Sequence, residues 1–339
     1  MGDKKLTLEI CIPTYNRCQQ LEYCLESIYM SIAKLSMERR KLVGIRVHNN
    51  STHGLSDYEK LLGSIINKFY EVGIGGFSYS ISGVDIGSPS NNYGVILSSS
   101  ADYAWYMPDD DLSRFDAIQT ILGAIDQYKP ALIVGGYEHN IGIDYSIHSN
   151  DDQRIPFLNE SNSIHSVVKE NKVDIFFKTN PVAAQNLVFN VQVLKNFLFK
   201  NNLAGLINPF IPTLLSLICL KDTAPAIFLR LSIGLFRFNE PYSNWRHEWP
   251  SYALQLWPQS IKQWVELGLL EKINPANRYY IRTLDYFRCR LHLFVWGIHK
   301  SKINLFIILR FYPVDFMVMI ITSPFHCINK IIIAVNKNL

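Results

Sequence analysis

The sequence has no dense block of Lys and Arg residues, and its formal net charge is only +4 over 339 residues. Its short basic run at 39–41 is typical of a solvated helix end, so the charge pattern argues against a nucleic-acid-binding protein. The six cysteines form no CxxC pair and show no zinc-ligand spacing, which argues against a zinc module and fits a reducing cytoplasm. No apolar secretory stretch precedes the first strand-like segment, so we expect no signal peptide.

Segments with the periodicity of strands and helices alternate along the first half of the chain. Apolar residues make up 48% of the sequence, enough for a substantial core in one large domain or in a domain with an appendage. The alternation predicts an α/β fold with a largely parallel central sheet and helices on both faces. The expected strands are 6–12, 42–47, 78–82, 101–107 and 131–136, and the expected helices are 21–35, 58–69, 91–99 and 115–125.

The first strand-like segment leads into a polar run, PTYNR, at 13–17. Apolar residues occupy every second position from 6 to 12, which predicts a strand with one buried face. Pro13 should end that strand, because proline has no N–H to donate. The apolar stripe that follows predicts a helix whose start Thr14 or Asn16 would cap. The first-turn N–H groups of such a helix can bind an anion.

Three consecutive carboxylates, Asp109, Asp110 and Asp111, follow another strand-like segment. Adjacent carboxylates repel one another unless a cation or ordered donors compensate. Mg²⁺ or Mn²⁺ would do so, since such an ion is usually held by one or two carboxylates together with substrate phosphate oxygens. The alternative is an acidic helix start, because acidic side chains favour the N-terminus of a helix such as the one expected from Phe115.

Polar clusters therefore end three separate strands, at 13–17, 48–52 and 109–111. In parallel sheets ligands bind beyond the carboxyl ends of the strands, so we expect the three clusters to form one site. With these motifs in this order, the sequence resembles family 2 glycosyltransferases of the GT-A fold, most closely bacterial O-antigen sugar transferases of the abequosyltransferase-like kind. The resemblance covers roughly residues 6 to 140, and its motifs are the runs at 12–17, 47–54 and 106–112 and Gly87 with Asn91.

The resemblance implies a nucleoside-diphosphate sugar as donor and a divalent cation, Mn²⁺ or Mg²⁺, as cofactor. The family's DxD motif can be aligned on Asp109 and Asp111, or shifted so that Asp110 and Asp111 close it, and Asp111 belongs to it in both registers. We expect the metal on Asp109 and Asp111. The residues expected to bind the nucleotide sugar are Pro13, Thr14, Tyr15, Arg17, His48, Asn50, Asn91, Asp109 and Asp110.

Two histidines depart from the family's pattern in the second motif. His48 stands where the family usually has the Asp that recognises the pyrimidine base, and His53 replaces a later Asp. A neutral imidazole can donate or accept one hydrogen bond, so base recognition could survive with an altered preference. The alternative is that His48 is a polar loop residue without contact to the donor.

The catalytic base is not evident from the sequence. The resemblance implies an inverting reaction with a carboxylate base in the half after the acidic motif, yet no Asp or Glu lies between Asp174 and Asp222. We favour His247 or Glu248, because the run at 237–249 interleaves aromatic rings with amide and charged groups that could bind a sugar. That run could equally be a packing loop. The other candidates are Asp151, Asp152, Glu160, Asp174, Asp222 and Glu240.

The expected organisation is a glycosyltransferase domain at 1–250, with a donor half (1–140) and an acceptor half (141–250), and a helical region at 251–339. Between 303 and 335 no stretch of eighteen residues is free of charge and proline, so a membrane-spanning helix is not expected. This apolar, mildly basic segment could instead lie on an anionic membrane, or pack against the domain or another subunit.

The resemblance also implies a biological setting. The protein would transfer a hexose or deoxyhexose at the cytoplasmic face of a bacterial plasma membrane, onto a polyprenyl-linked or other glycan acceptor. Such a reaction belongs to the synthesis of O-antigen, lipopolysaccharide or another surface polysaccharide. The competing hypothesis is a catalytically inactive member of the fold that binds nucleotide sugars or scaffolds an assembly complex, because of the two histidines and the missing carboxylates.

Overall fold

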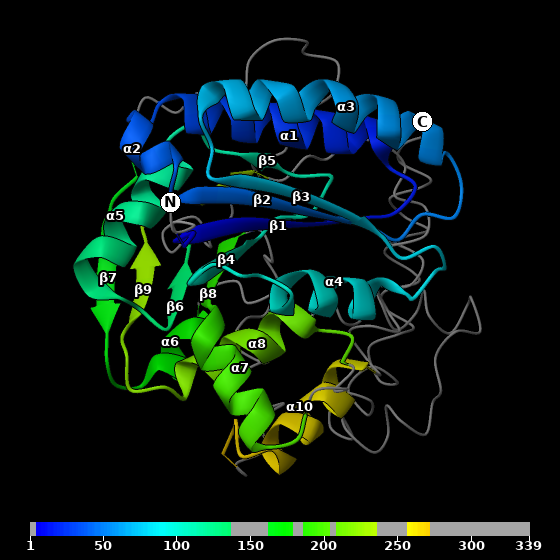
Figure 1. The fold of residues 1–339 in the computed structure, drawn as a ribbon. Coiled ribbons are helices and arrows are strands. Elements are labelled where there is room, and N and C mark those ends of the chain that lie inside the picture. Colours follow the sequence, from blue (N-terminus) through cyan, green and yellow to red (C-terminus); the bar gives the residue numbers. More distant parts are fainter. Residues whose placement is uncertain (1–4, 137–161, 179–185, 204–207, 236–255, 272–339) are drawn as a thin grey trace, which may run out of the picture. The chain divides into compact units, whose positions relative to one another are not determined.

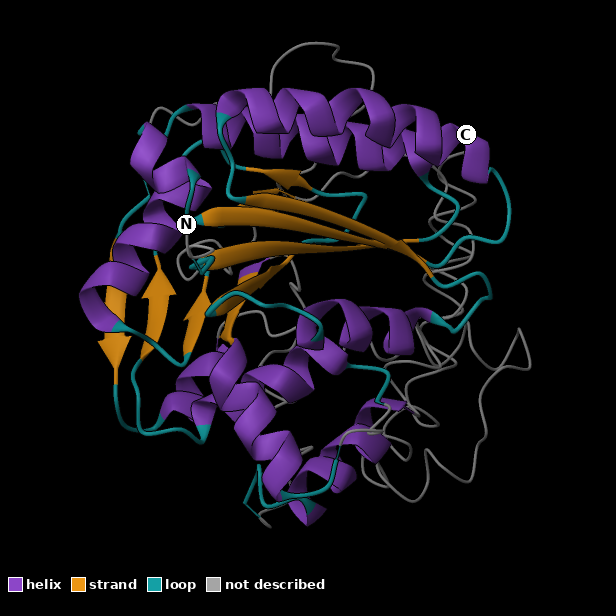
Figure 2. Ribbon diagram, in the orientation of Figure 1, coloured by secondary structure: helices purple, strands orange, loops and turns teal. Residues whose placement is uncertain are grey.

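Eight strands form the central sheet, in the order β3-β2-β1-β4-β8-β6-β9-β7 (Figures 1 and 2). A computed structural model describes residues 5–136, 162–178, 186–203, 208–235 and 256–271. The chain divides into two compact units, Met1–Glu240 and Pro241–Leu339, and the helix described in the second unit is α10, Trp257–Glu266. The predicted domain boundary at 250 stays a prediction, because it lies outside the described residues.

The first half of the sheet is parallel and the second half is mixed. β1 (Leu8–Thr14) pairs in parallel with β2 (Val43–Asn49) and β4 (Tyr103–Tyr106), and β2 pairs in parallel with β3 (Gly76–Ile81). β8 (Leu187–Asn190) is antiparallel to both β4 and β6 (Leu132–Val134). β9 (Ala226–Leu229) is parallel to β6, and β7 (Ile164–Val168) is antiparallel to β9. The carboxyl ends of β1, β2, β3, β4, β6 and β9 therefore meet at one edge, called here the strand-end edge.

Helices cover both faces of this sheet, so the predicted α/β class with a mostly parallel sheet is confirmed (Figure 1). One face carries α1 (Cys18–Ala33), α3 (Leu55–Val72) and α5 (Ala117–Tyr128). The other carries α4 (Ser88–Leu97), α7 (Val191–Lys200) and α8 (Ile211–Leu220). Two shorter helices are α2 (Met37–Arg40) and α6 (Lys172–Lys178). No helix within the described ranges is long and apolar enough to cross a membrane.

β1 is buried on both faces, which corrects the prediction of one buried face. The alternation seen in the sequence arises from Glu9 and Cys11, which are buried on the face opposite to α1. Glu9 is tolerated there because its carboxylate accepts hydrogen bonds from Arg46 Nε at 3.1 Å and from the Ser100 N–H at 3.3 Å. The alternation of apolar and polar residues therefore does not distinguish a strand face that carries a buried ion pair from one that is exposed to solvent.

β1 also continues through Pro13 to Thr14, so the prediction that Pro13 ends the strand is wrong. Successive residues of a strand direct their backbone groups to opposite sides, and the Thr14 carbonyl accepts a hydrogen bond from the Asn50 N–H of the β2 side at 2.9 Å. Pro13 therefore faces the β4 side. The ladder between β1 and β4 ends at Cys11 and Tyr106, so no hydrogen bond is required of Pro13.

The acidic triplet does not begin a helix. α5 starts only at Ala117, and the short strand β5 (Leu112–Ser113) lies between it and Asp111. β5 pairs antiparallel with β10 (Gly234–Leu235). The alternative interpretation of the triplet as an acidic helix start is therefore wrong, and the carboxylates lie in the connection that leaves β4 at the strand-end edge.

Candidate functional site

Hydroxyl groups, not a helix cap, hold the turn after β1. The N-cap of α1 is Arg17, without a capping side-chain hydrogen bond, so neither Thr14 nor Asn16 has the predicted role. The buried Tyr58 hydroxyl of α3 accepts a hydrogen bond from the Arg17 N–H at 2.8 Å and lies 3.1 Å from the Thr14 hydroxyl. Ser51 Oγ accepts a hydrogen bond from the Asn16 N–H at 2.7 Å. These bonds fix the turn against α3 and the end of β2.

Arg17 joins this turn to the acidic triplet. Its Nη1 atom lies 2.5 Å from Asp110 Oδ2 and 3.3 Å from Asp109 Oδ1. The guanidinium is partly exposed, whereas both carboxylates are largely buried, so the ion pairs close the inner side of the site and leave Arg17 open to solvent. The structure thus brings together two motifs that are far apart in the sequence.

Asp109 is a buried carboxylate, and its Oδ2 atom has no hydrogen-bond partner within the described part of the chain. Burial and the charge of Asp110 raise the pKa of Asp109 to about 7, although Arg17 and the Thr14 hydroxyl act in the opposite direction. Burial and then the same carboxylates raise the pKa of Tyr106 well above its usual range. Burial is the first cause of both pKa shifts, and the neighbouring carboxylates of the triplet add to it.

The triplet fits a divalent cation. Asp109 and Asp111, the residues predicted to hold the metal, are both buried and offer the oxygen ligands that Mg²⁺ and Mn²⁺ prefer. Within the described ranges, no group of three or more His, Cys, Asp and Glu side chains could by itself hold a metal ion. Asp109 Oδ2, which has no hydrogen-bond partner among the described residues, therefore suits a cation that takes its remaining ligands from substrate phosphates and water.

The other predicted nucleotide-binding residues lie at the ends of β2 and at α4. His48 belongs to β2, so its placement in a loop is wrong, and its Nδ1 atom is buried without a hydrogen-bond partner. Asn91 of α4 is also buried. Its Nδ2 donates to the Thr14 carbonyl at 3.4 Å, and its Oδ1 has no partner among the residues that the structure describes. Asn50, by contrast, donates through Nδ2 to Asp85 in the loop after β3, at 2.8 Å.

Sequence reasoning did not single out two residues at this edge, Tyr58 and Asp85. Tyr58 occupies a buried position of the α3 stripe, where the sequence pattern predicts a core residue and does not indicate a role for its hydroxyl. Asp85 could have been found as a carboxylate that follows a third parallel strand. Of the remaining predicted residues, Pro13 is buried within β1 and Tyr15 is exposed in the turn.

The two predicted catalytic residues, His247 and Glu248, lie outside the described residues. Asp174 and Asp222 are described, and both lie away from the strand-end edge. Asp222 precedes β9, which starts at the opposite edge because it runs parallel to β6. Asp174 lies on α6, which follows the end of β7 beside the start of β9. The topology therefore places neither residue where it could reach the acidic triplet. The other base candidates, Asp151, Asp152, Glu160 and Glu240, are also outside the described residues.

Asn186 organises the strand-end edge in the second half of the sheet. It is buried directly before β8, beside the end of β6. Its Oδ1 accepts hydrogen bonds from the N–H groups of Ile233 at 2.9 Å and Gly234 at 3.2 Å, and its Nδ2 lies 3.3 Å from Ser232 Oγ. These bonds fix the segment that enters β10, which pairs with β5 next to the triplet. An amide is not a useful base near neutral pH, and the contacts of Asn186 give it a structural role.

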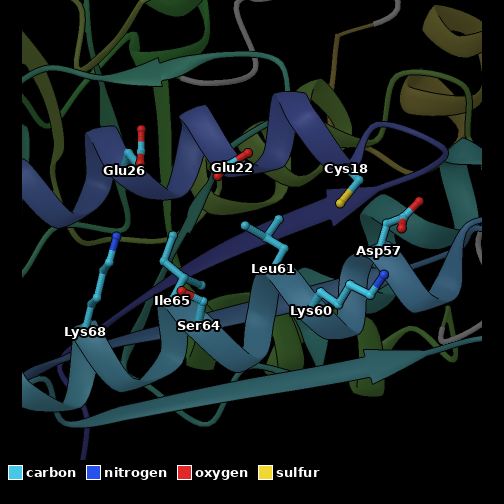
Figure 3. A pocket seen from close by; sticks show the side chains of 9 residues that line it. All are labelled: Cys18, Glu22, Glu26, Asp57, Lys60, Leu61, Ser64, Ile65 and Lys68. Atoms are coloured by element: carbon cyan, nitrogen blue, oxygen red, sulfur yellow. The ribbon is translucent and has the colours of Figure 1, made fainter.

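A cavity of about 340 Å³ lies in the groove between α1 and α3 (Figure 3). Glu22 and Glu26 of α1 lie across this groove from Lys60 and Lys68 of α3, with Cys18 at one end. Burial and neighbouring acidic residues raise the pKa of the Cys18 thiol, which therefore stays protonated near neutral pH. Acidic and basic side chains face each other across this groove and its thiol is unreactive, so the groove is a poor candidate for the functional site. We therefore assign the site to the strand-end edge.

Comparison with known proteins agrees with the fold. No protein-family model and no curated protein matches the sequence. S. aureus TarS 1–349 in complex with UDP is 10% identical, with 86% of this chain and 80% of that chain covered and a TM-score of 0.48. The mannosyltransferase PcManGT from Pyrobaculum calidifontis, in complex with GDP-Man and Mn²⁺, is 12% identical, with 95% and 76% covered and a TM-score of 0.51. The second likeness supports the GT-A fold for this chain, and at this identity it extends to the fold alone.

Proposed function

We propose that this protein is a glycosyltransferase that takes a sugar from a nucleoside-diphosphate sugar, with Mn²⁺ or Mg²⁺ as cofactor. One observation carries the proposal. Arg17 lies 3.3 Å from the buried carboxylate of Asp109, whose other oxygen has no partner, at the strand-end edge. A cationic group that can bind a diphosphate thus lies beside oxygen ligands that can bind a divalent cation. The fold shared with a mannosyltransferase whose structure is in complex with GDP-Man and Mn²⁺ supports it.

The acidic triplet and Arg17 would bind the charged part of the donor. Asp109 and Asp111 would hold the cation, which when bound would neutralise the diphosphate and favour its departure. Arg17, which Asp110 orients through their ion pair, would contact the diphosphate from the other side. The first-turn backbone N–H groups of α1, which begins directly after Arg17, would also favour an anion.

The nucleoside would lie along the ends of β1 and β2. Pro13 and Thr14 at the end of β1 and Tyr15 in the turn would lie beneath it, and the buried atoms His48 Nδ1 and Asn91 Oδ1 have no partner among the described residues. Buried polar atoms are rarely left unpaired, so a ligand that bonds to them would complete the site.

The transfer itself would proceed by direct displacement. A hydroxyl oxygen of the acceptor would attack the anomeric carbon and lose its proton to His247 or Glu248, while the bond from that carbon to the diphosphate oxygen breaks. The configuration at the anomeric carbon would then invert. Glu248→Gln and His247→Gln should each be measured for kcat and for donor affinity, and loss of kcat with unchanged affinity identifies the base.

The acceptor would be a lipid-linked or other glycan in surface polysaccharide synthesis, such as that of O-antigen. The segment 303–339 would then hold the enzyme at the cytoplasmic face of the membrane through its apolar, mildly basic character. Deletion of 303–339 should release the protein from anionic vesicles that the full chain binds. Equal sedimentation of both forms with the vesicles would refute this attachment.

The alternative function is a catalytically inactive member that only binds nucleotide sugars. His48 at the expected base-reading position and the scarcity of carboxylates before Asp222 motivate it. Turnover of UDP-, GDP-, CDP- and dTDP-sugars, measured with Mn²⁺ and with EDTA, separates the two. Metal-dependent release of nucleoside diphosphate supports the enzyme, whereas nucleotide binding without turnover of any donor supports the binding protein.

A further inference from the structure

The loop between β3 and α4 carries a carboxylate, Asp85, to which the roles above assign no function. Its Oδ1 accepts hydrogen bonds from Asn50 Nδ2 and from the Gly87 N–H, both at 2.8 Å. Asn50 holds the same loop, because its own Oδ1 accepts a hydrogen bond from the Ile86 N–H at 2.9 Å. The buried Asn50 is in turn fixed to β1, since its N–H donates to the Thr14 carbonyl at 2.9 Å. Asp85 therefore has a defined place at the strand-end edge.

The carboxylate of Asp85 is ionised and open to a ligand. The Gly87 N–H and then the Asn50 amide lower its pKa, and the Tyr15 hydroxyl adds to this. An ionised carboxylate only accepts hydrogen bonds. Asp85 is exposed, and its Oδ1 already accepts two hydrogen bonds, so a ligand donor would bond to Oδ2 in the neighbourhood of the Tyr15 hydroxyl.

Exposed apolar side chains flank this carboxylate. Its chain neighbours Val84 and Ile86 are 60% and 39% exposed, and Tyr15 is 43% exposed. Apolar side chains around a fixed polar group are typical of a surface that holds a ligand with apolar faces and a polar edge. A nucleobase has this form, because its ring faces stack on side chains while its edge forms hydrogen bonds.

The strand order gives the distance from Asp85 to the acidic triplet. Asp85 follows β3 and is bonded to the end of β2, whereas Asp109 follows β4, with β1 between them. Neighbouring strands lie about 4.8 Å apart, so two to three spacings separate the carboxylates by roughly 10–14 Å. A ribose and a diphosphate can bridge this span. Figure 1 shows the start of α4 at the same end of the sheet as the turn between β1 and α1.

We propose that Asp85 recognises the base of the donor and that this base is uracil or thymine, an inference that rests on the proposed function. Both pyrimidines present one N–H donor, at N3, which suits a carboxylate whose Oδ1 already accepts two hydrogen bonds. Guanine presents two adjacent N–H donors, which suit a carboxylate with both oxygens free. Cytosine has no N–H at N3: its donor is the exocyclic N4 amino group, and the acceptor N3 beside that group would repel the carboxylate.

Calorimetric binding of UDP, dTDP, CDP and GDP in the presence of Mn²⁺ tests the assignment on the full chain. The wild type should bind UDP or dTDP at least about tenfold more tightly than CDP or GDP. Asp85→Asn keeps an oxygen for Asn50 and Gly87 and replaces Oδ2 with an NH₂ donor. It should lose about ten- to a hundredfold in affinity for UDP and dTDP while its affinity for CDP rises.

Two further variants separate base recognition from loop structure. Asp85→Ala should weaken UDP and dTDP binding without a gain for CDP, and Asp126→Asn, on the exposed side of α5, should change no affinity. Equal losses for all four nucleotides in Asp85→Asn, no loss at all, or a wild-type preference for GDP or CDP would overturn the assignment and leave the proposed function standing. A wild-type protein that binds none of the four nucleotides would contradict both the assignment of Asp85 and the proposed function.

Discussion

Two buried asparagines at the strand-end edge, Asn91 and Asn186, show how the two halves of the sheet differ. They are 3% and 5% exposed, so water satisfies neither. Asn186 uses its whole amide, since Oδ1 accepts two backbone N–H groups and Nδ2 bonds to Ser232. Asn91 uses only Nδ2, in a long bond of 3.4 Å, and its Oδ1 has no partner. Within the described residues, both amide atoms of Asn186 therefore form hydrogen bonds, whereas the amide of Asn91 forms one only through Nδ2.

The neighbours of each asparagine repeat this contrast. Around β1, β2 and β4, His48 Nδ1 and Asp109 Oδ2 are also buried, and neither has a partner in the described ranges. Beside the end of β9, Asn162 both accepts from the Leu231 N–H at 2.9 Å and donates to the Leu231 carbonyl at 3.0 Å. Unpaired buried polar groups cost stability, and they persist in proteins where a ligand completes them. The first half therefore has the character of a binding site and the second that of its scaffold.

Among the variants that test this contrast, Asp111→Ala should have the largest effect, and the effect is on turnover. If the triplet holds the cation, metal-dependent turnover should fall about a thousandfold or more, because the diphosphate loses the charge that stabilises its departure. The urea midpoint should stay close to that of the wild type, since one of three adjacent carboxylates is removed. Initial rates across a Mn²⁺ titration provide the measurement.

Asp126→Ala is the matched control for that variant. Asp126 is an exposed residue of α5 and bonds only at the surface, to Arg39 at 2.6 Å. Surface ion pairs contribute about 0–1 kcal/mol, so this variant should keep both the rate and the midpoint. A full rate in Asp111→Ala would take Asp111 out of the metal site.

Asn186→Ala should have the largest effect on stability. It leaves the N–H groups of Ile233 and Gly234 without their acceptor, which should lower the free energy of unfolding by about 2–4 kcal/mol. Urea denaturation monitored by circular dichroism measures it, with the exposed Asn67→Ala on α3 as the control, expected within about 0.5 kcal/mol of the wild type. Unchanged stability together with weakened nucleotide binding would assign Asn186 to the binding site instead.

The sequence predicted the fold class because strand and helix periods are local. The apolar stripe of α1 places Leu21, Leu25, Ile28 and Ile32 in the core as expected. The sequence-based predictions were wrong where contacts between distant parts of the chain determine the local structure. Pro13 is tolerated because the ladder to β4 has already ended, and no local signal marks that point.

The candidate site was predictable to the extent that it follows strand ends. Arg17 and Asp109 were both expected there, since carboxyl ends of parallel strands share one edge. The partners that hold them were not, because a hydrogen bond such as that from the Arg17 N–H to the Tyr58 hydroxyl depends on how α3 packs against α1. The side chain of Tyr58 has the same sequence signature as any aromatic core residue.

Asn91→Ala should give the opposite result to Asn186→Ala. Because Asn91 Oδ1 has no partner within the described part of the chain, its loss should change the free energy of unfolding by less than about 1 kcal/mol. Affinity for the nucleoside diphosphate should fall about five- to thirtyfold, since a ligand hydrogen bond in a buried site is lost. Calorimetry on both variants measures the two affinities, and exchanged results would reverse the roles given to the two halves.

Asp109→Asn should give the smallest change, and its sign distinguishes a binding site from a scaffold. Replacing a buried, partly uncompensated carboxylate with an amide of the same shape should raise the stability of the metal-free protein by about 0.5–1 kcal/mol. With Mn²⁺ and a nucleoside diphosphate the order should reverse, because only the wild type gains stability from binding both. Thermal unfolding with and without the two ligands gives both signs in one experiment. If Asp109→Asn lowers stability in both conditions, Asp109 belongs to the scaffold, and the contrast between the two halves fails at its central residue.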